Sequence, residues 1–154
     1  MGDAMKQPVP ARPLPLNESA GFLTNKAAHA LKLGLLRSFK LRGLDVTTEQ
    51  WGVLNLLFHK DGLTQTELAR TAIKDKPNIT RILDTMEKKK LVVRQPDPND
   101  GRTFRIHLTG KGRALTPELL ECAHATLRQA TRGLSPRQLG EYRTALEVII
   151  KNLT

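Results

Sequence analysis

Residues 64–108 of this chain read TQTELARTAIKDKPNITRILDTMEKKKLVVRQPDPNDGRTFRIHL, and this stretch decides the fold. Thr64 and Glu67 have the spacing of a capping box, in which the two side chains satisfy the first backbone amides of a helix. A second helix is expected to start at Asp75 and Pro77, because aspartate caps helices and proline loses no hydrogen bond in the first turn. One face of this second helix is apolar and carries Ile79, Ile82, Leu83 and Met86.

Two strand-like segments follow these helices. Residues 91–94 are mostly apolar. Residues 103–108 alternate in character, so that three side chains are expected to face inward: Phe104, Ile106 and Leu108. Between the segments, residues 96–102 read PDPNDGR, and Leu63 is expected to add a short third strand. The order helix, helix, β-hairpin predicts a winged helix-turn-helix that binds DNA, in a mainly α protein with a small antiparallel β wing (an α+β fold).

The composition indicates a basic protein with a polyanionic partner. The 154 residues carry a formal net charge of +10, and residues 64–113 hold twelve Lys and Arg against six Asp and Glu. This placement of charge is the footprint expected for contacts with DNA phosphates. The one cysteine, Cys122, excludes an internal disulfide and suits a reducing compartment. No stretch resembles a membrane span or a signal peptide, which predicts a cytoplasmic protein without a membrane partner.

Helices are expected on both sides of the DNA-binding stretch. A first long helix starts at Asn17 or Ser19 and runs to about Leu41, and a capping box formed by Thr47 and Gln50 opens the next one.

After the hairpin, residues 109–112 begin a further helix. Pro117 predicts a kink or break in it, because proline removes an amide and clashes with the preceding turn. Ser135, followed by Pro136 and Gln138, predicts the start of a last helix.

The terminal helices carry apolar stripes of their own. In the last helix the stripe advances by alternating steps of three and four residues, through Leu139, Tyr142, Leu146, Ile149 and Leu153. Such stripes need a partner, which predicts a two-fold homodimer suited to a palindromic DNA site. The expected parts are a flexible arm, an N-terminal dimerisation helix, a winged helix-turn-helix domain and C-terminal dimerisation helices, at residues 1–16, 17–45, 46–109 and 110–154. An arm that orders itself on the partner subunit or on DNA is the alternative for residues 1–16.

The order of these elements and several local signatures resemble the MarR (multiple antibiotic resistance regulator) family. The matching residues are 63–69 (LTQTELA), 80–89 (TRILDTMEKK) followed by Leu91 and Val92, the wing residues Asp97, Asp100 and Arg102, and 106–109 (IHLT) with Gly112. The likeness spans roughly residues 17–153 and implies a nucleoid-associated regulator of a prokaryote. Two positions depart from the family pattern: Lys90 stands where glycine is usual, and Asn99 where arginine is frequent.

Candidate DNA contacts follow from these elements. Side chains at the exposed start of the second helix are expected to reach base edges in the major groove: Lys76, Pro77, Asn78, Thr80 and Arg81. Arg102 at the hairpin tip is placed to enter the minor groove, and the resemblance implies that Asp100 orients it. Contacts to phosphate are expected from Gln65, Thr66, Arg70, Lys74 and Arg105. For any single one of these residues, an ordinary solvated surface position is the alternative.

The resemblance also implies a ligand-responsive repressor, commonly relieved by small phenolic or carboxylate compounds. The expected pocket residues are Phe22, His29, Lys32, Trp51 and Phe58, with His29 or Lys32 as the partner of an anion. The alternative is that the aromatic residues belong to the core and that His29 is an ordinary interface residue. Cys122 would sense oxidants only as an exposed thiolate, and an inert cysteine is the favoured interpretation.

No catalytic, metal or cofactor site is expected. The chain has no phosphate loop and no nucleophile elbow, and its four histidines are too scattered to form a closed metal site. Two alternatives to a repressor remain: a winged helix that docks a protein, and a DNA-binding activator or redox sensor of the same fold.

Overall fold

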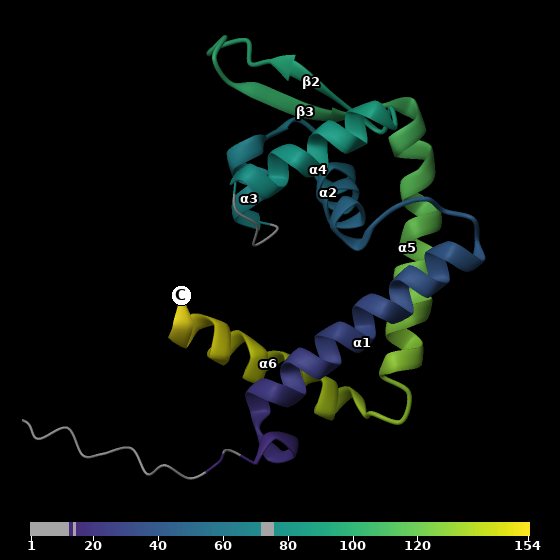
Figure 1. Cartoon of the computed structure of the whole chain (residues 1–154), viewed down its shortest axis with the longest axis vertical. Helices are drawn as coiled ribbons and strands as arrows, with labels where there is room; N and C mark the ends of the chain where they lie inside the picture. Colours follow the sequence, from purple (N-terminus) through teal and green to yellow (C-terminus); the bar gives the residue numbers. More distant parts are fainter. Residues whose placement is uncertain (1–12, 14, 72–75) are drawn as a thin grey trace, which may run out of the picture. The chain divides into compact units, whose positions relative to one another are not determined.

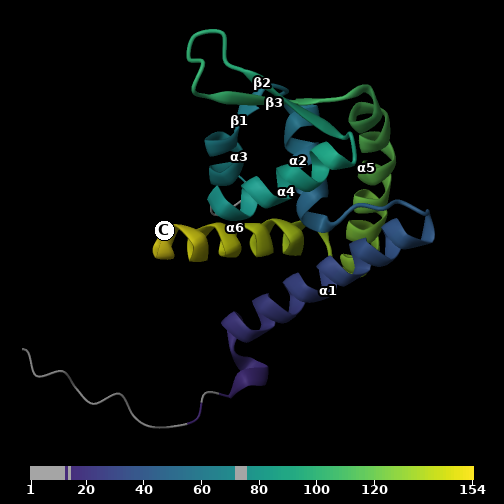
Figure 2. The same ribbon diagram turned by 45° about the horizontal axis from the view of Figure 1, so that its top comes forward.

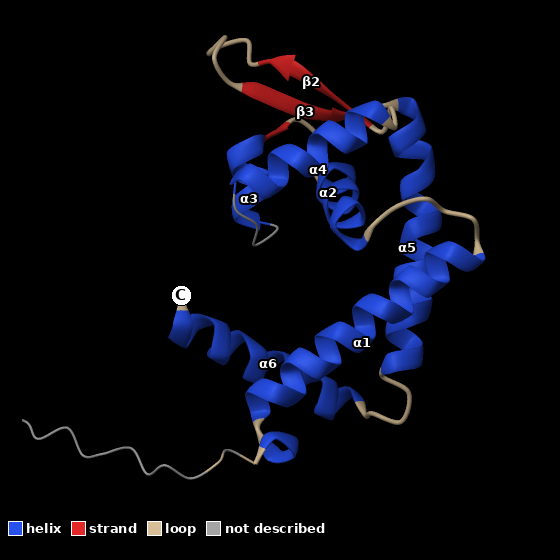
Figure 3. Ribbon diagram, in the orientation of Figure 1, coloured by secondary structure: helices blue, strands red, loops and turns tan. Residues whose placement is uncertain are grey.

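The computed structural model of this chain describes Pro13, residues 15–71 and residues 76–154, with Lys76 and Pro77 described by their backbone alone. The chain divides into two compact units, Met1–Ala30 and Leu31–Thr154, and each is described by itself. Helices make up most of the described residues, with one small sheet (Figures 1 and 3). The predicted fold class, mainly helical with a small antiparallel wing, is confirmed.

The N-terminal unit contains the 3-10 helix η1 (Leu16–Glu18) and the first half of α1 (Ala20–Leu41). The Ser19 hydroxyl accepts a hydrogen bond from the Phe22 amide at 3.5 Å, so Ser19 rather than Asn17 caps α1. The helix ends within the larger unit. There Gly43 has a φ of 69°, and the Leu44 amide donates to the Phe39 carbonyl at 2.9 Å.

The winged-helix segment (residues 63–108) has the predicted order of elements. They are β1 (Leu63–Thr64), α3 (Gln65–Thr71), α4 (Lys76–Lys88), β2 (Val92–Pro96) and β3 (Phe104–Leu108). The strands pair antiparallel in the order β1-β3-β2, so Leu63 does supply the third strand. Figure 2 shows α3, α4 and the preceding α2 (Thr48–His59) on one side of this sheet.

Capping boxes form where the sequence predicts them. The Thr64 amide donates to Glu67 Oε2 at 2.8 Å, and the Glu67 amide donates to Thr64 Oγ1 at 3.2 Å. The same reciprocal pair starts α2, and another starts α6 (Pro136–Leu153); their residues are Thr47 with Gln50 and Ser135 with Gln138. The predicted Asp75 cap lies outside the described residues.

One buried core joins the winged-helix segment to α2 and to α5 (Gly110–Ala130). Its fully buried side chains include Leu54, Leu57, Leu68, Ile79, Leu83, Met86, Ile106 and Leu119. Burying each such side chain contributes about 1.5–3 kcal/mol. The predicted apolar face of α4 is thereby confirmed. Its opposite face remains exposed at Arg81, Thr85 and Lys88.

The prediction that Phe104 faces the core is wrong, because 46% of this residue is exposed. Phe104 pairs with Pro96 at the far end of the hairpin, whereas Ile106 and Leu108 lie nearer the helices and are buried. The alternation in sequence identified the inner face of β3 correctly. Of the three positions on that face, only Phe104, the one beside the hairpin tip, lies outside the buried core.

The predicted break at Pro117 is also wrong, because α5 runs unbroken from Gly110 to Ala130. Proline at this position leaves the Arg113 carbonyl without its amide partner. Arg113 and Pro117 are both exposed, so water can solvate that carbonyl. On the inner side of this turn the buried Thr116 hydroxyl has a partner of its own, because it donates to the Gly112 carbonyl at 2.8 Å.

The last helix, α6, buries none of its residues within the larger unit. Its predicted stripe is half-buried at Leu139 and Leu146, and exposed at Tyr142, Ile149 and Leu153. Val148 and Ile150 are also about half exposed, at 51% and 52%. The described helices include none that is long and apolar enough to cross a membrane.

Lys90 ends α4 in the left-handed conformation, with a φ of 58°. Its amide donates to the Glu87 carbonyl at 2.8 Å and the Leu91 amide to the Met86 carbonyl at 2.9 Å, which is a Schellman motif. Replacing Lys90 by glycine is expected to raise the free energy of unfolding by about 1 kcal/mol, because the steric strain at Cβ disappears. Urea unfolding measures this change. Lys88→Gly, at the last residue of the helix, should lower stability by up to about 1 kcal/mol, and a shift in the same direction for both variants would contradict the argument.

Candidate nucleic-acid interface

α4 is the candidate reading helix, and its buried residues determine which side chains remain outside. Ile79 and Leu83 are fully buried and anchor the helix on the core. Asn78 and Thr80 are half-buried beside them, and Arg81 is exposed. The side chains of Lys76 and Pro77 lie outside the described part of the chain, so their base contacts stay predictions.

A direct contact joins α3 to the reading helix. Gln65 Nε2 donates to Thr80 Oγ1 at 2.5 Å. Gln65, predicted to touch phosphate, therefore also positions a predicted base-contacting residue. Thr66 and Arg70 are exposed on α3, as contacts to phosphate require, and Lys74 lies outside the described residues.

The wing tip is held by two aspartates that bond to backbone amides. Asp97 Oδ1 accepts from the Asn99 amide at 2.8 Å, and Asp100 Oδ1 accepts from the Arg102 amide at 3.1 Å. Asp100 Oδ2 also accepts from the Thr103 hydroxyl at 2.8 Å. Asp100 thus orients the backbone of Arg102, while the Arg102 side chain is exposed.

Arg105 braces the base of this tip. Its Nε donates to Asp97 Oδ2 at 2.5 Å, and its Nη1 donates to the Gly62 carbonyl at 2.8 Å. The Asn99 amide, and after it the Arg105 guanidinium, lower the pKa of the Asp97 carboxyl below its ordinary value, against the effect of burial. Arg105 was predicted only as a phosphate contact, but it also holds the base of the wing tip in place.

Sequence reasoning missed Asp61, which links the wing to α5. Its Oδ1 accepts from the Leu108 amide at 2.9 Å, and its Oδ2 lies 3.2 Å from His107 Nδ1 and 3.4 Å from Arg113 Nη2. The residues come from a turn, a strand and a helix that are distant in sequence. No local pattern signals such a cluster. Sequence reasoning also missed Arg94, which connects β2 to α4 and is described below.

A cavity of about 330 Å³ lies among α1, α2 and α5. It is lined by Leu31, Lys32, Leu35, Thr48, Trp51, Ala123, Thr126 and Leu127. Of the predicted pocket residues, Lys32 and Trp51 line this cavity and Phe58 does not. Phe22 and His29 belong to the N-terminal unit, where Phe22 is half-buried and His29 is exposed, and their part in a pocket stays a prediction.

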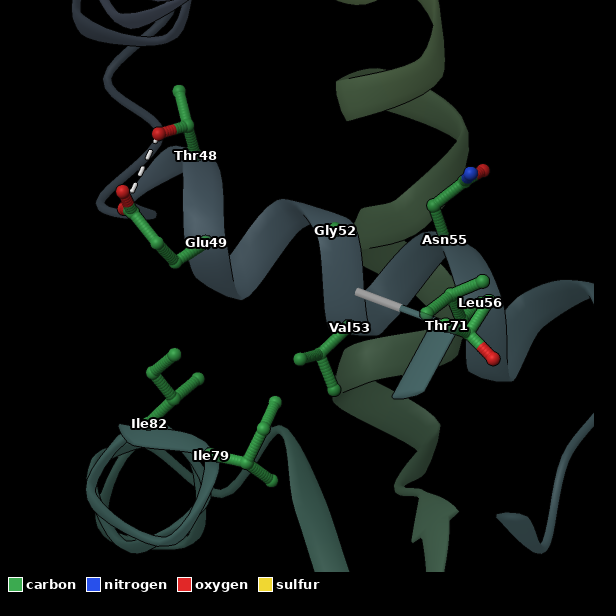
Figure 4. A pocket seen from close by; sticks show the side chains of 9 residues that line it. All are labelled: Thr48, Glu49, Gly52, Val53, Asn55, Leu56, Thr71, Ile79 and Ile82. Carbon is green, nitrogen blue, oxygen red and sulfur yellow. Dashed lines mark hydrogen bonds between the residues drawn. The ribbon is translucent and has the colours of Figure 1, made fainter. Parts of the chain in front are cut away.

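A second hollow, of about 350 Å³, runs between α2 and α4. Figure 4 shows its apolar side, where Val53 of α2 lies opposite Ile79 and Ile82 of α4. Its polar end is formed by Thr48 and Glu49, whose side chains are hydrogen bonded at 3.2 Å. Thr48 lines both hollows, so the first turn of α2 separates the cavity from the groove beside the reading helix.

Lys32 stabilises the ionised form of the Glu49 carboxyl group in this turn. Lys32 Nζ lies 2.6 Å from Glu49 Oε1, and this hydrogen bond is the main reason why the pKa of Glu49 falls to about 2. A pKa below the unfolded-state value stabilises the fold at pH values above about 4.5, and this contribution is lost as the pH falls towards 2. Lys32 is 49% exposed, so solvent screening limits the contribution.

Replacing Glu49 by glutamine should therefore lower the free energy of unfolding by about 0.5–1 kcal/mol at neutral pH. The difference from wild type should shrink steadily below about pH 4.5, because the wild-type carboxylate is then protonated as well. Urea unfolding at several pH values measures it. Glu141→Gln, which removes the exposed Arg137 pair on α6, is the control. A difference for Glu49→Gln that does not change with pH would contradict the ion-pair origin.

Comparison with known proteins agrees with this geometry. Residues 44–103, from before α2 to the wing tip, match the model of the MarR family. The HTH-type transcriptional repressor IacR of Pseudomonas putida is 27% identical over 113 residues, which are 73% of this chain and 68% of that protein.

Solved structures extend the likeness to most of the chain. A probable transcriptional regulator from Pseudomonas aeruginosa is 28% identical with a TM-score of 0.78, over 87% of this chain and 98% of that one. A MarR family regulator from Silicibacter pomeroyi is 25% identical with a TM-score of 0.75, over 93% and 97% of the two chains. The family model, the sequence relative and the fold agree, and they identify the winged helix-turn-helix part of the chain, residues 44–103, as that of a MarR family transcription regulator.

Proposed function

We propose that this chain is a homodimeric repressor that recognises a palindromic operator and releases it when a small aromatic acid binds. The observation that carries the proposal is that two exposed arginines project from firmly held backbones. Arg81 stands on a helix anchored by Ile79 and Leu83, and Arg102 stands in a tip fixed by Asp100. Preorganised cationic side chains on a helix and on a wing suit the major and the minor groove of one duplex.

The roles divide as follows. Side chains at the start of α4 meet base edges, and Arg102 enters the minor groove. The exposed Thr66 and Arg70 contact phosphate, which sets the register without selecting sequence. Gln65 and Arg105 hold the reading residues and the wing in place, in addition to any phosphate contact.

The uncovered apolar face of α6 supports the homodimer. Tyr142, Ile149 and Leu153 lie on one stripe and are 47%, 41% and 83% exposed, which is costly in water unless a second copy covers them. A two-fold dimer repeats α4 and the wing on both sides of its axis and therefore matches a palindrome. Sedimentation of the wild type and of Ile149→Glu, which places a charge in this stripe, tests the assembly.

The cavity lined by Trp51 supports the effector. The described residues that line it are mostly apolar and include Trp51, and the cation among them, Lys32, suits a carboxylate that competes with Glu49. Trp51 is the only tryptophan of the chain, so its fluorescence reports occupancy directly. Titration with benzoate and with phenol should change this fluorescence in the wild type. Lys32→Met should weaken the benzoate response more than the phenol response.

The alternatives have less support. A wing that docks a protein would not need an exposed arginine, Arg102, on a hairpin tip that Asp100 holds in one conformation. Cys122 is fully buried, which favours an inert cysteine over an oxidant sensor. An activator would share the geometry and differ in where its operator lies. Binding to chromosomal DNA would place the protein in the cytoplasm of a prokaryote, at the nucleoid.

Footprinting on the DNA that flanks the protein's own gene tests the function. One protected palindrome, with an affinity that falls steeply as salt rises, is the expected result. Transcription from that fragment should fall when the protein is added and recover when the effector is added. Weak binding without sequence preference would overturn the operator model, and higher transcription on binding would make the protein an activator.

A further inference from the structure

Arg94 occupies an unusual position on the wing. It pairs with Ile106 in the β2–β3 register, so its side chain leaves the sheet on the same face as the fully buried Ile106. The Arg94 side chain is only 18% exposed. A charged group on the inner face of a sheet is costly unless its charge and its donors are satisfied.

Two carboxylates of the reading helix satisfy it. Arg94 Nη2 donates to Asp84 Oδ1 at 2.7 Å, and Arg94 Nη1 donates to Glu87 Oε2. The Arg94 amide also donates to Glu87 Oε1 at 3.1 Å, so Glu87 holds both the side chain and the backbone of this residue. Asp84 and Glu87 are three residues apart and therefore lie on one face of α4.

Stability alone does not account for this arrangement. The carboxylates are partly exposed, at 52% for Asp84 and 36% for Glu87, and such ion pairs stabilise a fold weakly. An apolar side chain at the inner position would join β2 to α4 without the desolvation of a charge. A guanidinium that bonds to two carboxylates instead fixes one direction of approach, because its donors are rigid and planar.

We propose that Arg94, with Asp84 and Glu87, is a positioning residue that sets the wing at a fixed angle to the reading helix. The inference rests on the DNA-reading roles of α4 and Arg102 proposed above. When the pairs are broken, the wing is no longer held in register with α4, and Arg102 loses its preset approach to the minor groove. Contacts made by α4 and contacts made by the wing then cease to reinforce each other.

A double-mutant cycle between Arg94 and Arg102 tests this role, with the full chain and a duplex that the wild type selects from a random pool. Arg102→Ala should weaken binding by about tenfold or more in the wild type, but by less than about threefold when Arg94 is already alanine. A residue that affected only folding would leave the Arg102 penalty unchanged at temperatures where both proteins are folded. Equal penalties in the two backgrounds would overturn the proposal.

Matched variants guard against loss of fold. Asp84→Asn with Glu87→Gln removes the partner charges, retains the shape of both side chains, and should reduce the Arg102 penalty in the same way. Arg137→Ala removes the helical ion pair with Glu141 on α6 and should leave that penalty unchanged. If the double variant retains the full penalty, the ion pairs do not position the wing.

The outcome is separable from that of the proposed function. If the random pool yields no preferred sequence, sequence-specific recognition fails, whatever the role of Arg94. The same cycle is then measured on a mixed-sequence duplex at low salt, where loss of Arg102 still removes a groove or phosphate contact. A reduced penalty there supports the positioning role, and an unchanged penalty overturns it.

Discussion

Replacing Gly112 by alanine is expected to lower the free energy of unfolding by about 3 kcal/mol. A Cβ atom at this position would lie 2.2 Å from the Leu91 carbonyl oxygen and 3.2 Å from its carbonyl carbon. Both are backbone atoms, so no side-chain rotation relieves the overlap. The first turn of α5 has to move away from the segment that joins α4 to β2.

That movement would break the junction between the two helices. The Thr109 amide donates to the Leu91 carbonyl at 3.1 Å, and the Thr109 hydroxyl donates to the Lys90 carbonyl at 2.6 Å. Lys111 Nζ donates to the Lys89 carbonyl at 3.0 Å. These bonds cap the end of α4 with groups from the start of α5, so the cost of the added methyl group includes unsatisfied carbonyls as well as overlap.

Urea unfolding followed by circular dichroism measures the loss. Gly110→Ala is the matched control, because Gly110 lies in the same turn and has no other atom within 4 Å of an added Cβ. Alanine has a higher helix propensity than glycine, so this control substitution should be neutral or should stabilise the fold by up to about 1 kcal/mol. Similar midpoints for the two variants would show that the close approach to Leu91 is not a constraint.

Features that depend on neighbours in sequence were predicted correctly. The capping box of Thr64 and Glu67 involves residues three apart in sequence. Its hydrogen bonds need only that a helix starts at this point. The apolar face of α4 follows from helical spacing, and Ile79, Leu83 and Met86 are indeed fully buried. The turn at Lys90 was indicated instead by the family resemblance, because this lysine stands where glycine is usual, and its φ is indeed 58°.

Errors arose where the answer depends on what lies beyond the element. Phe104 continues the alternation of β3, but the extent of the helices beneath the sheet decides whether an inward side chain is buried. Pro117 breaks the hydrogen-bond pattern of a helix, but packing of its other residues and solvation of one exposed carbonyl keep α5 continuous. Local propensity is weaker than tertiary packing in both cases.

For the same reason, part of the candidate site could not be predicted from the sequence. In the sequence, Arg94 and Asp61 look like ordinary charged residues of a basic protein, and Arg105 was predicted only as a phosphate contact. Their partners stand on other elements, such as Gly62 for Arg105, which lies 43 residues away. Sequence patterns therefore indicated the side chains that we propose to face DNA, whereas the side chains that hold them in place could be identified only from the fold.

Replacing Asn78 or Arg81 by alanine is expected to change sequence preference at one base pair each, by about 1–3 kcal/mol. Asparagine pairs with an adenine edge and arginine with a guanine edge through two hydrogen bonds, and alanine offers neither. Replacing Arg102 by alanine should instead weaken binding to different sequences by similar factors, with A·T-rich flanks losing most, because the minor groove distinguishes bases poorly.

Competition among duplexes that differ by single base pairs measures these preferences. Lys88→Ala is the matched control, because this exposed basic residue stands on the same helix, three turns beyond its reading end. Its loss should leave relative affinities unchanged. If Asn78→Ala and Arg81→Ala also left the ranking of the duplexes intact, the first turns of α4 would not read bases. Sequence recognition would then have to come from the wing or from the shape of the DNA.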